Sequence, residues 1–372
     1  TLRPSRLSAP GVEILSAPKL GDARGFSSVG LAAGLKRSGK LDLGILYSDR
    51  PCTAAGVFTL NRVAAAPVVY DRAVLRSNSG AVRAVVVNSG HANAATGPAG
   101  MALARRMAAA AERNLKVGAK TALICSTGII GDLPNETVLL RGIEMASRRL
   151  SASDVDFQKC ILTTDKVEKV AGVRLRFSNH RPAHIVGVAK GSGMNAPNMA
   201  TMLAFIVTDA AVSSAFLKKA LKSAADESFN CISVDADTST NDTVLVLANG
   251  ASGQRAAPRG SRLTENAGIF AAGLKDICHR LAWKMMEDGE GAEKVIEVVV
   301  EGARTVSSAK RAARTVAESL LVRTAIHGGD PNIGRVLAAL GRSGVPEVRE
   351  ERIDVFFNGI RGVHHGVIDR ST

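Results

Sequence analysis

Short runs of apolar, β-branched residues recur along the chain and predict buried strands. The clearest is MLAFIV at residues 202–207, which is strand-length and ends in polar residues. No apolar run approaches the roughly 18 residues that a membrane-spanning helix needs, so no membrane partner is expected. The predicted strands are Leu43–Tyr47, Gly56–Leu60, Ala84–Asn88, Thr121–Cys125, Ile185–Ala189, Met202–Asp209, Thr243–Ala248, Val295–Val300 and Arg352–Phe357.

Between these runs, apolar residues recur three and four positions apart, which predicts amphipathic helices. In Gly100–Leu115, Arg and Glu lie opposite the apolar face, and Gly118 follows the end. Further helices are predicted at Asn135–Arg149, Ser213–Ser228, Asn266–Glu287 and Asp330–Gly341. Strands and helices alternate irregularly, which favours an α/β or α+β layered fold. At 372 residues, two domains or one large domain with an appended lobe are expected.

The charge balance is strongly basic and could suit nucleic acid, anionic lipid or an anionic substrate. Lys and Arg number 48 against 34 Asp and Glu, which gives a formal net charge of +14. Aromatic residues make up only 3%, so stacking on single-stranded nucleic acid is poorly supported. The densest basic groups, Arg148–Arg149 and Lys310–Arg311, lie in helical patterns and suit solvated helix faces. Nucleic acid is therefore not an expected partner.

The five cysteines are far apart and include no C-x-x-C pair, so neither a zinc site nor a redox motif is indicated. A reducing compartment is the simplest interpretation. The first residues, TLRPSRLSAP, lack the apolar core of a secretory signal. A clipped leader stays open, and so does the choice between bacterial cytoplasm and mitochondrial matrix.

Three familiar site types do not fit. The segment KGSGMNAP from Lys190 matches a permissive dinucleotide fingerprint, but it leaves no room for a crossover helix before the next strand. Asp235 and Asp237 open like a calcium loop, yet Thr240 replaces its glycine and Val246 its glutamate. That loop, with Asp242, is expected to act through structural hydrogen bonds. No G-x-S-x-G or H-E-x-x-H pattern occurs.

Two patterns do suggest acyl chemistry. Ser126–Gly128 directly follows a predicted strand, where backbone N–H groups and a hydroxyl could stabilise an oxyanion, although a plain turn explains the spacing equally well. Thr201 follows the Gly- and Pro-containing loop between small and apolar residues. A threonine hydroxyl needs a base, and cleavage before Thr201 would make its own α-amine that base.

These residues resemble the ornithine acetyltransferase (bifunctional glutamate N-acetyltransferase) family of arginine biosynthesis. The segment KGSGMNAPNMATMLAFIVTDA from Lys190 is similar to the self-cleavage segment of that family. Six further segments agree in order: NSGHANAATG from Asn88, STGIIG from Ser126, TTD from Thr163, FNCISVDADTSTNDT from Phe229, DGEGAEK from Asp288 and HGGDPNIGR from His327. The resemblance implies an α/β layered fold with strands sandwiched between helices.

It also implies self-cleavage between Ala200 and Thr201, giving an α chain (1–200) and a β chain (201–372) in an α2β2 assembly. Thr201 would carry acetyl from N2-acetylornithine to glutamate. Thr127 and Gly128 match the oxyanion hole, and Thr164, Lys190 and Glu290 match substrate-binding positions. No cofactor or metal is implied, and acetyl-CoA is a possible co-substrate.

The chain departs from the family pattern at four positions: Asn is usual at His91, Cys at Ala95, an aliphatic residue at Asn195 and Trp at Ile333. It ends at Thr372, before a family segment that contacts substrate, so the β chain is expected to be short and its pocket incomplete. Two alternatives stay open. One is a self-cleaving amidohydrolase or aminopeptidase, which would yield no N-acetylglutamate, and the other is a non-catalytic member of the family.

Overall fold

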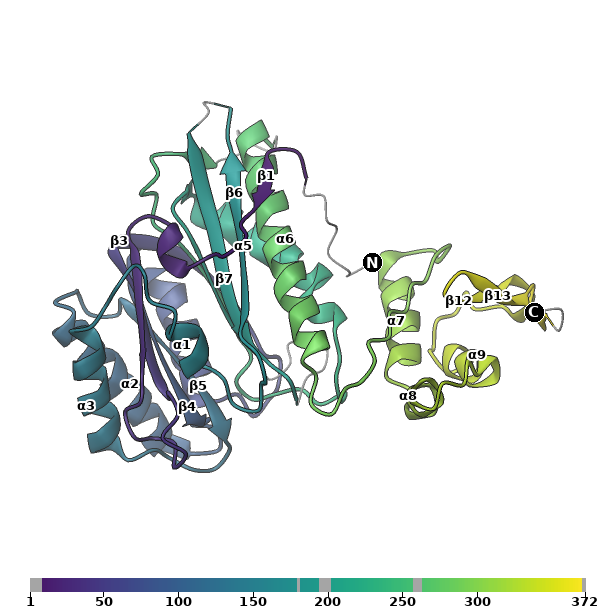
Figure 1. The fold of residues 1–372 in the computed structure, drawn as a ribbon, viewed down its shortest axis with the longest axis horizontal. Helices are drawn as coiled ribbons and strands as arrows, with labels where there is room; N and C mark the ends of the chain where they lie inside the picture. Colours follow the sequence, from purple (N-terminus) through teal and green to yellow (C-terminus); the bar gives the residue numbers. More distant parts are fainter. Residues whose placement is uncertain (1–8, 179–180, 194–201, 257–262, 370–372) are drawn as a thin grey trace. The chain divides into compact units, whose positions relative to one another are not determined.

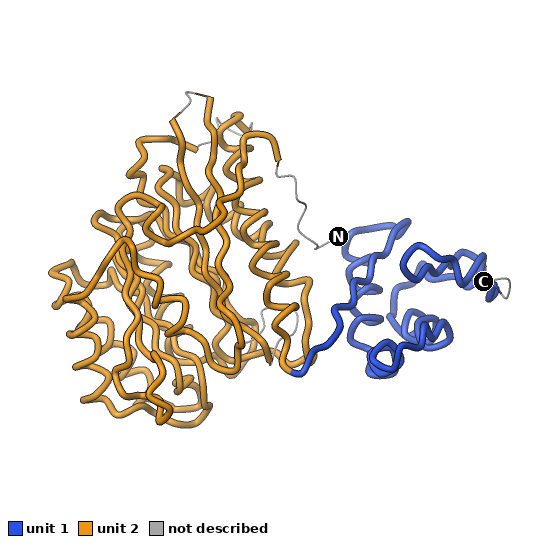
Figure 2. Tube along the Cα trace, in the orientation of Figure 1, with its two compact units in different colours: residues 1, 291–372 blue, residues 2–290 orange. Residues whose placement is uncertain are grey.

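The computed structural model describes residues 9–178, 181–193, 202–256 and 263–369. The chain divides into a large unit of residues 2–290 and a small unit of residues 291–372 (Figure 2). This agrees with the expected large domain and appended lobe. The predicted α and β chains would arise by cleavage of the backbone between residues 200 and 201, and this division stays a prediction.

The large unit is built on a sheet with helices packed against it (Figure 1). Its nine strands have the order β1-β6-β7-β8-β10-β3-β4-β5, with β2 paired to β3. Its strands are β1 (Val12–Ile14), β2 (Phe26–Leu31), β3 (Leu43–Phe58), β4 (Val82–His91), β5 (Ala122–Ile129), β6 (Lys169–Arg176), β7 (Pro182–Lys190), β8 (Leu203–Thr208) and β10 (Thr243–Ala248). A separate parallel pair joins β9 (Ala211–Val212) and β11 (Arg255–Ala256).

Strand β3 joins the strands β2, β4 and β5 to the rest of the sheet. Its first residues pair with β2 and β4, and Thr53–Phe58 pair with β10. The register shifts between Tyr47 and Cys52, where the exposed residues 49–51 interrupt the pairing with β4. The two strands predicted at Leu43–Tyr47 and Gly56–Leu60 are therefore one irregular strand.

Helices cover the sheet and one 3-10 turn follows β1. These elements are η1 (Leu20–Asp22), α1 (Ala66–Asn78), α2 (Gly97–Asn114), α3 (Glu136–Ser147), α4 (Phe157–Cys160), α5 (Ser214–Glu227), η2 (Phe229–Cys231) and α6 (Glu265–Glu287). Two caps fix helix starts, since the Asn135 and Thr264 side chains accept backbone N–H groups at the first turns of α3 and α6. No helix in the described residues is long and apolar enough to cross a membrane.

Alternating side chains on the strands form three apolar layers. In β8, Phe205 faces a core that it shares with residues of β4 and β5, whereas Ile206 faces α5 and α6. On β4, Val86 turns the other way and packs with residues of α2 and α3. Both faces of the central strands are thus covered, which explains their continuous apolar sequences. The predicted layering, with strands sandwiched between helices, is confirmed.

Within its described residues, the small unit contains three α-helices, one 3-10 turn and a three-stranded antiparallel sheet. Its elements are α7 (Val306–Ala317), α8 (Leu320–His327), α9 (Ile333–Gly341), η3 (Glu350–Arg352), β12 (Val355–Phe357), β13 (Ile360–His364) and β14 (Val367–Ile368). A small core of Val316, Val322 and Ala339 holds the helices together.

The strand predicted at Val295–Val300 is wrong, because the structure has no regular element there. The segment is almost entirely β-branched, VIEVVV, which is the composition of a strand. Val295 and Val299 are nevertheless 41% and 54% exposed, and no described strand pairs with the segment. Without a backbone partner, β propensity alone does not form a strand.

Candidate active site

The predicted site residues come from strand ends and from the loops that follow them. Thr127 and Gly128 lie at the end of β5, and Lys190 ends β7. Lys190 pairs in register with Leu203, the first residue of β8. Ala200 and Thr201 themselves lie outside the described residues.

Two adjacent residues connect the start of β8 to the end of β5. The Met202 N–H donates to Asp242 Oδ1 at 2.9 Å, and the Thr243 N–H donates to the Met202 carbonyl at 3.1 Å. The Asn241 side-chain amide donates to the Ser126 carbonyl at 2.8 Å. The residue after Thr201 is therefore joined to the residue before Thr127 through Asn241 and Asp242.

Gly128 occupies a position that only glycine fits. Its φ is +135°, and an added Cβ would lie 2.2 Å from the Gly90 carbonyl carbon on the paired strand β4. Gly128 is exposed, whereas the neighbouring Thr127 is buried. Close packing of the two strand ends thus presents the Gly128 backbone at an accessible edge. The geometry suits an oxyanion-binding position, and that role stays a prediction.

Ser192 brings two predicted substrate-binding residues together. Its hydroxyl lies 2.7 Å from Thr164 Oγ1, and its carbonyl accepts the Glu290 N–H at 2.7 Å. Lys190 Nζ donates to Thr163 Oγ1 at 2.7 Å, and Thr163 is next to Thr164 in the chain. Thr164, Lys190 and Glu290 are therefore neighbours in space, as a shared pocket requires.

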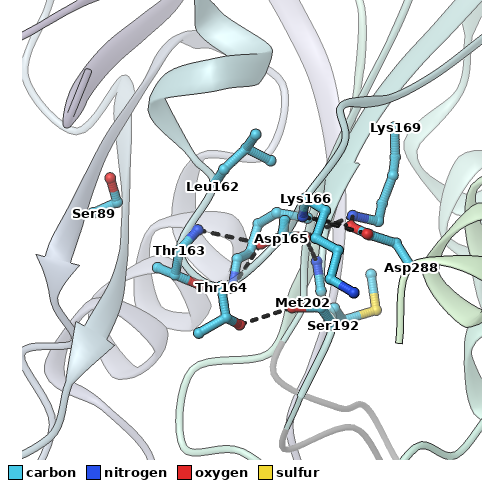
Figure 3. Close-up of polar contacts among 12 residues, drawn as sticks. Ser89, Leu162, Thr163, Thr164, Asp165, Lys166, Lys169, Ser192, Met202 and Asp288 are labelled. Atoms are coloured by element: carbon cyan, nitrogen blue, oxygen red, sulfur yellow. Dashed lines mark hydrogen bonds and ion pairs between the residues drawn. The ribbon is translucent and has the colours of Figure 1, made fainter. Parts of the chain in front are cut away.

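A buried ionic network lies next to Thr164 and Lys190. Lys169 Nζ donates to Asp165 Oδ1 at 2.7 Å and to Asp288 Oδ2 at 2.5 Å, and all three side chains are almost fully buried (Figure 3). Asp165 in turn accepts the Gly191 N–H at 2.7 Å and lies 3.8 Å from Lys190 Nζ. The network holds the loop after β7 at its first residue.

Asp165 and Lys190 have shifted pKa values. Burial by itself would raise the pKa of Asp165, but the ammonium groups of Lys190 and Lys169 bring it below its usual value. Burial lowers the pKa of Lys190, and the Asp165 carboxylate opposes this change. A lysine whose charge is only partly compensated can bind a substrate carboxylate.

Sequence reasoning missed the positioning residues of the site. The sequence pattern gives Lys169 and Ser192 no role, and Asp165 and Asp288 stand in it only within the motifs TTD and DGEGAEK. The pattern around Asp242 predicts only a structural polar turn. The available signal was weak: each is polar and lies next to a motif or a buried strand.

Comparison with known proteins identifies the chain. The sequence model of the ArgJ family matches residues 27–372. The chain belongs to the ArgJ family. The ArgJ protein of Thermotoga neapolitana, named arginine biosynthesis bifunctional protein ArgJ, is 48% identical over 340 residues, which cover 91% of this chain and 84% of that protein. The Geobacter sulfurreducens protein of the same name is 44% identical over 348 residues, 93% of this chain and 86% of the relative.

One solved structure is an ornithine acetyltransferase complexed with ornithine from Mycobacterium tuberculosis. It is 36% identical, covers 50% of this chain and 98% of its own, and has a TM-score of 0.46. ArgJ membership, shown by the family and by the relatives above, confirms the predicted resemblance. It also confirms the prediction of an enzyme of arginine biosynthesis that transfers acetyl groups.

Proposed function

We propose that this ArgJ chain transfers acetyl from N2-acetylornithine to glutamate through an ester on Thr201. Ornithine leaves first, and glutamate then takes the acetyl group to give N-acetylglutamate. The observation that carries the proposal is the pair Asn241–Asp242, which ties Met202 to Ser126. A nucleophile one residue before Met202 would lie close to the Thr127–Gly128 edge, where an oxyanion needs hydrogen-bond donors.

The proposed nucleophile is made by self-cleavage. The Thr201 hydroxyl attacks the Ala200 carbonyl, the acyl group moves from nitrogen to oxygen, and water hydrolyses the resulting ester. The products are residues 1–200 and a chain that begins with a free Thr201 amine. That amine can accept the hydroxyl proton during acetyl transfer.

The remaining site residues receive roles by charge. Lys190 suits the carboxylate of the amino-acid substrates, and Glu290 suits an amino group. Thr164, beside Ser192, is the proposed hydroxyl contact. Acetyl-CoA is retained as a possible second donor, as the name bifunctional in the relatives suggests, and an α2β2 assembly is proposed for the cleaved chains.

We place the reaction in the cytoplasm. Two observations support this: the relatives named above are bacterial, and all five cysteines are free thiols.

Intact mass under denaturing conditions tests self-cleavage. We expect two fragments that meet at Ala200 and Thr201 in the wild type and one uncut chain in Thr201→Ala. Thr324→Ala, an exposed helix position in the small unit, is the matched control and should be cut. The acetyl-transfer assay follows, with N2-acetylornithine and glutamate. An uncut wild-type chain, or ornithine release without N-acetylglutamate, would contradict the proposal.

A further inference from the structure

The loop of residues 161–168 carries Thr163 and Thr164 and has no regular secondary structure (Figure 3). It joins α4 to β6, and both threonines are exposed. The ionic network holds its second half, where Asp165 binds Lys169. Backbone groups outside helices and strands take one position only where other parts of the chain bind them. The contacts of the first half of the loop therefore decide where the two threonines lie.

Two side-chain donors bind the backbone at the start of this loop. Lys36 Nζ donates to the Leu162 carbonyl at 2.8 Å and to the Leu41 carbonyl at 3.0 Å. The Ser89 hydroxyl donates to the Cys160 carbonyl. The Leu162 carbonyl belongs to the planar peptide bond that Thr163 completes, so Lys36 fixes the orientation of the peptide next to the threonines.

Lys36 is itself held in place by its own loop, between β2 and β3. Its backbone N–H and those of the three preceding residues donate to the Asp42 carboxylate at 2.6 to 3.2 Å. Asp42 is 0% exposed. An ordinary surface lysine keeps its ammonium group in water, since ordering the long side chain costs conformational entropy. Here the ammonium group binds two main-chain oxygens from a fixed backbone, which suits a tether between loops.

The same lysine lies against the predicted oxyanion edge. A Cβ added at Gly90 would be 3.3 Å from Lys36 Cγ, so the stem of the lysine passes next to Gly90. Gly90 pairs with Gly128, and Ser89 pairs with Thr127, across β4 and β5. Lys36 and Ser89 therefore connect the end of β5 to the loop that carries the threonines.

We propose that Lys36 is a positioning residue for substrate binding, which holds the 161–168 loop at a fixed distance from the Thr127–Gly128 edge. This inference rests on the proposed function, in which substrates bind at Thr164 and Lys190 while the acetyl carbonyl lies at that edge. Lys36 acts through the Leu162 carbonyl and not by contact with substrate. Since N2-acetylornithine and glutamate use the same loop in turn, Lys36 affects the binding of both.

The test is the separation of KM from kcat in Lys36→Met, measured on the cleaved full chain. Methionine keeps an unbranched apolar stem but has no donor for Leu162. If the loop is then in place about a tenth of the time, KM for both substrates rises about tenfold, because apparent affinity falls by the fraction of competent molecules. Substrate that does bind meets the same catalytic groups, so kcat should stay within about twofold of wild type.

Two further variants serve as a rescue and a control. Lys36→Arg keeps a charged donor group and should return both KM values to within about threefold of wild type. Lys40→Met removes the same charge from an exposed position of the same loop, and it should leave both KM values unchanged. The inference is overturned if Lys40→Met raises KM as much as Lys36→Met. It is also overturned if Lys36→Met lowers kcat at unchanged KM, which is the effect of having less folded enzyme.

Failure of the proposed function is distinguishable from failure of this inference. If the wild type forms no N-acetylglutamate, the proposed function fails and the inference falls with it. If N-acetylglutamate forms and Lys36→Met keeps the wild-type KM values, only the inference fails. If Lys36→Met does not fold or remains uncut, Lys36→Gln replaces it, with the same rise in KM expected. An unfolded or uncut chain in both variants overturns the inference, because Lys36 would then be required for folding or maturation.

Discussion

Replacing Lys169 by Met should strongly destabilise the large unit. Lys169 is 0% exposed, and its ammonium group contacts two carboxylates, Asp165 and Asp288. Methionine approximates its length and packing but leaves both carboxylates without this partner. Breaking a buried ion pair in this way typically costs about 3–5 kcal/mol. The loss of stability is not larger than this, because each carboxylate keeps a backbone donor. Asp288 still accepts the Lys166 N–H, and Asp165 still accepts the Gly191 N–H.

Urea unfolding followed by tryptophan fluorescence measures this loss cleanly. Trp283 is the single tryptophan and lies on α6, so its signal reports the large unit. We expect the free energy of unfolding at pH 7 to fall by about 3–5 kcal/mol. Lys159→Met is the control: Lys159 pairs with Asp156 at 2.9 Å on the exposed surface, and its removal should change little.

The pH dependence gives a second check of the same reasoning. The folded-state pKa of Asp165 is lowered, so its stabilising contribution is present above the unfolded value of about 3.9 and is lost as the pH falls through the folded value. The difference in free energy of unfolding between wild type and Lys169→Met should therefore become smaller below about pH 4. A gap as small as that of Lys159→Met at pH 7, or one that widens on acidification, would refute the reasoning.

Two further predictions concern the end and the middle of β5. Gly128→Ala should lower kcat of acetyl transfer about 10²–10³-fold, the effect of losing one oxyanion donor, since its Cβ would overlap Gly90. Gly131→Ala has a positive φ but open space around it, so a comparable loss there would argue against the overlap. Asp71, on α1, accepts the Ile124 N–H in the middle of β5. Burial raises the folded pKa of Asp71 well above its usual value, so ionised Asp71 lowers the free energy of unfolding increasingly as the pH rises from about 4. Asp71→Asn should raise the melting temperature at pH 7.5 and lose this gain near pH 4; a gain independent of pH would exclude burial of charge as its cause.

Local sequence predicted the elements whose pattern is strong. The run that forms β8 is apolar on both faces because helices and strands cover both sides of it, so its sequence alone marks a buried strand. Strands β2 and β6 and helices α1, α7 and α8 are among the elements that the sequence pattern does not predict. In β6, Arg174 and Arg176 point outward among apolar residues, and α1 has only a narrow apolar face. Short elements of this kind gain their stability from neighbours that are distant in sequence.

The motifs of the sequence also determined the family and the predicted nucleophile, because a self-cleavage segment and an oxyanion turn are local patterns that survive without coordinates. Only the tertiary structure decided which charges are buried. Lys169 and Asp288 are 119 residues apart and read separately as ordinary surface residues. Asp242 reads as one more polar residue of a turn until the fold sets it against Met202. The physical reason is that the free energy of a charge depends on its solvent exposure and on its partners in space, and neither is encoded in a short stretch of chain.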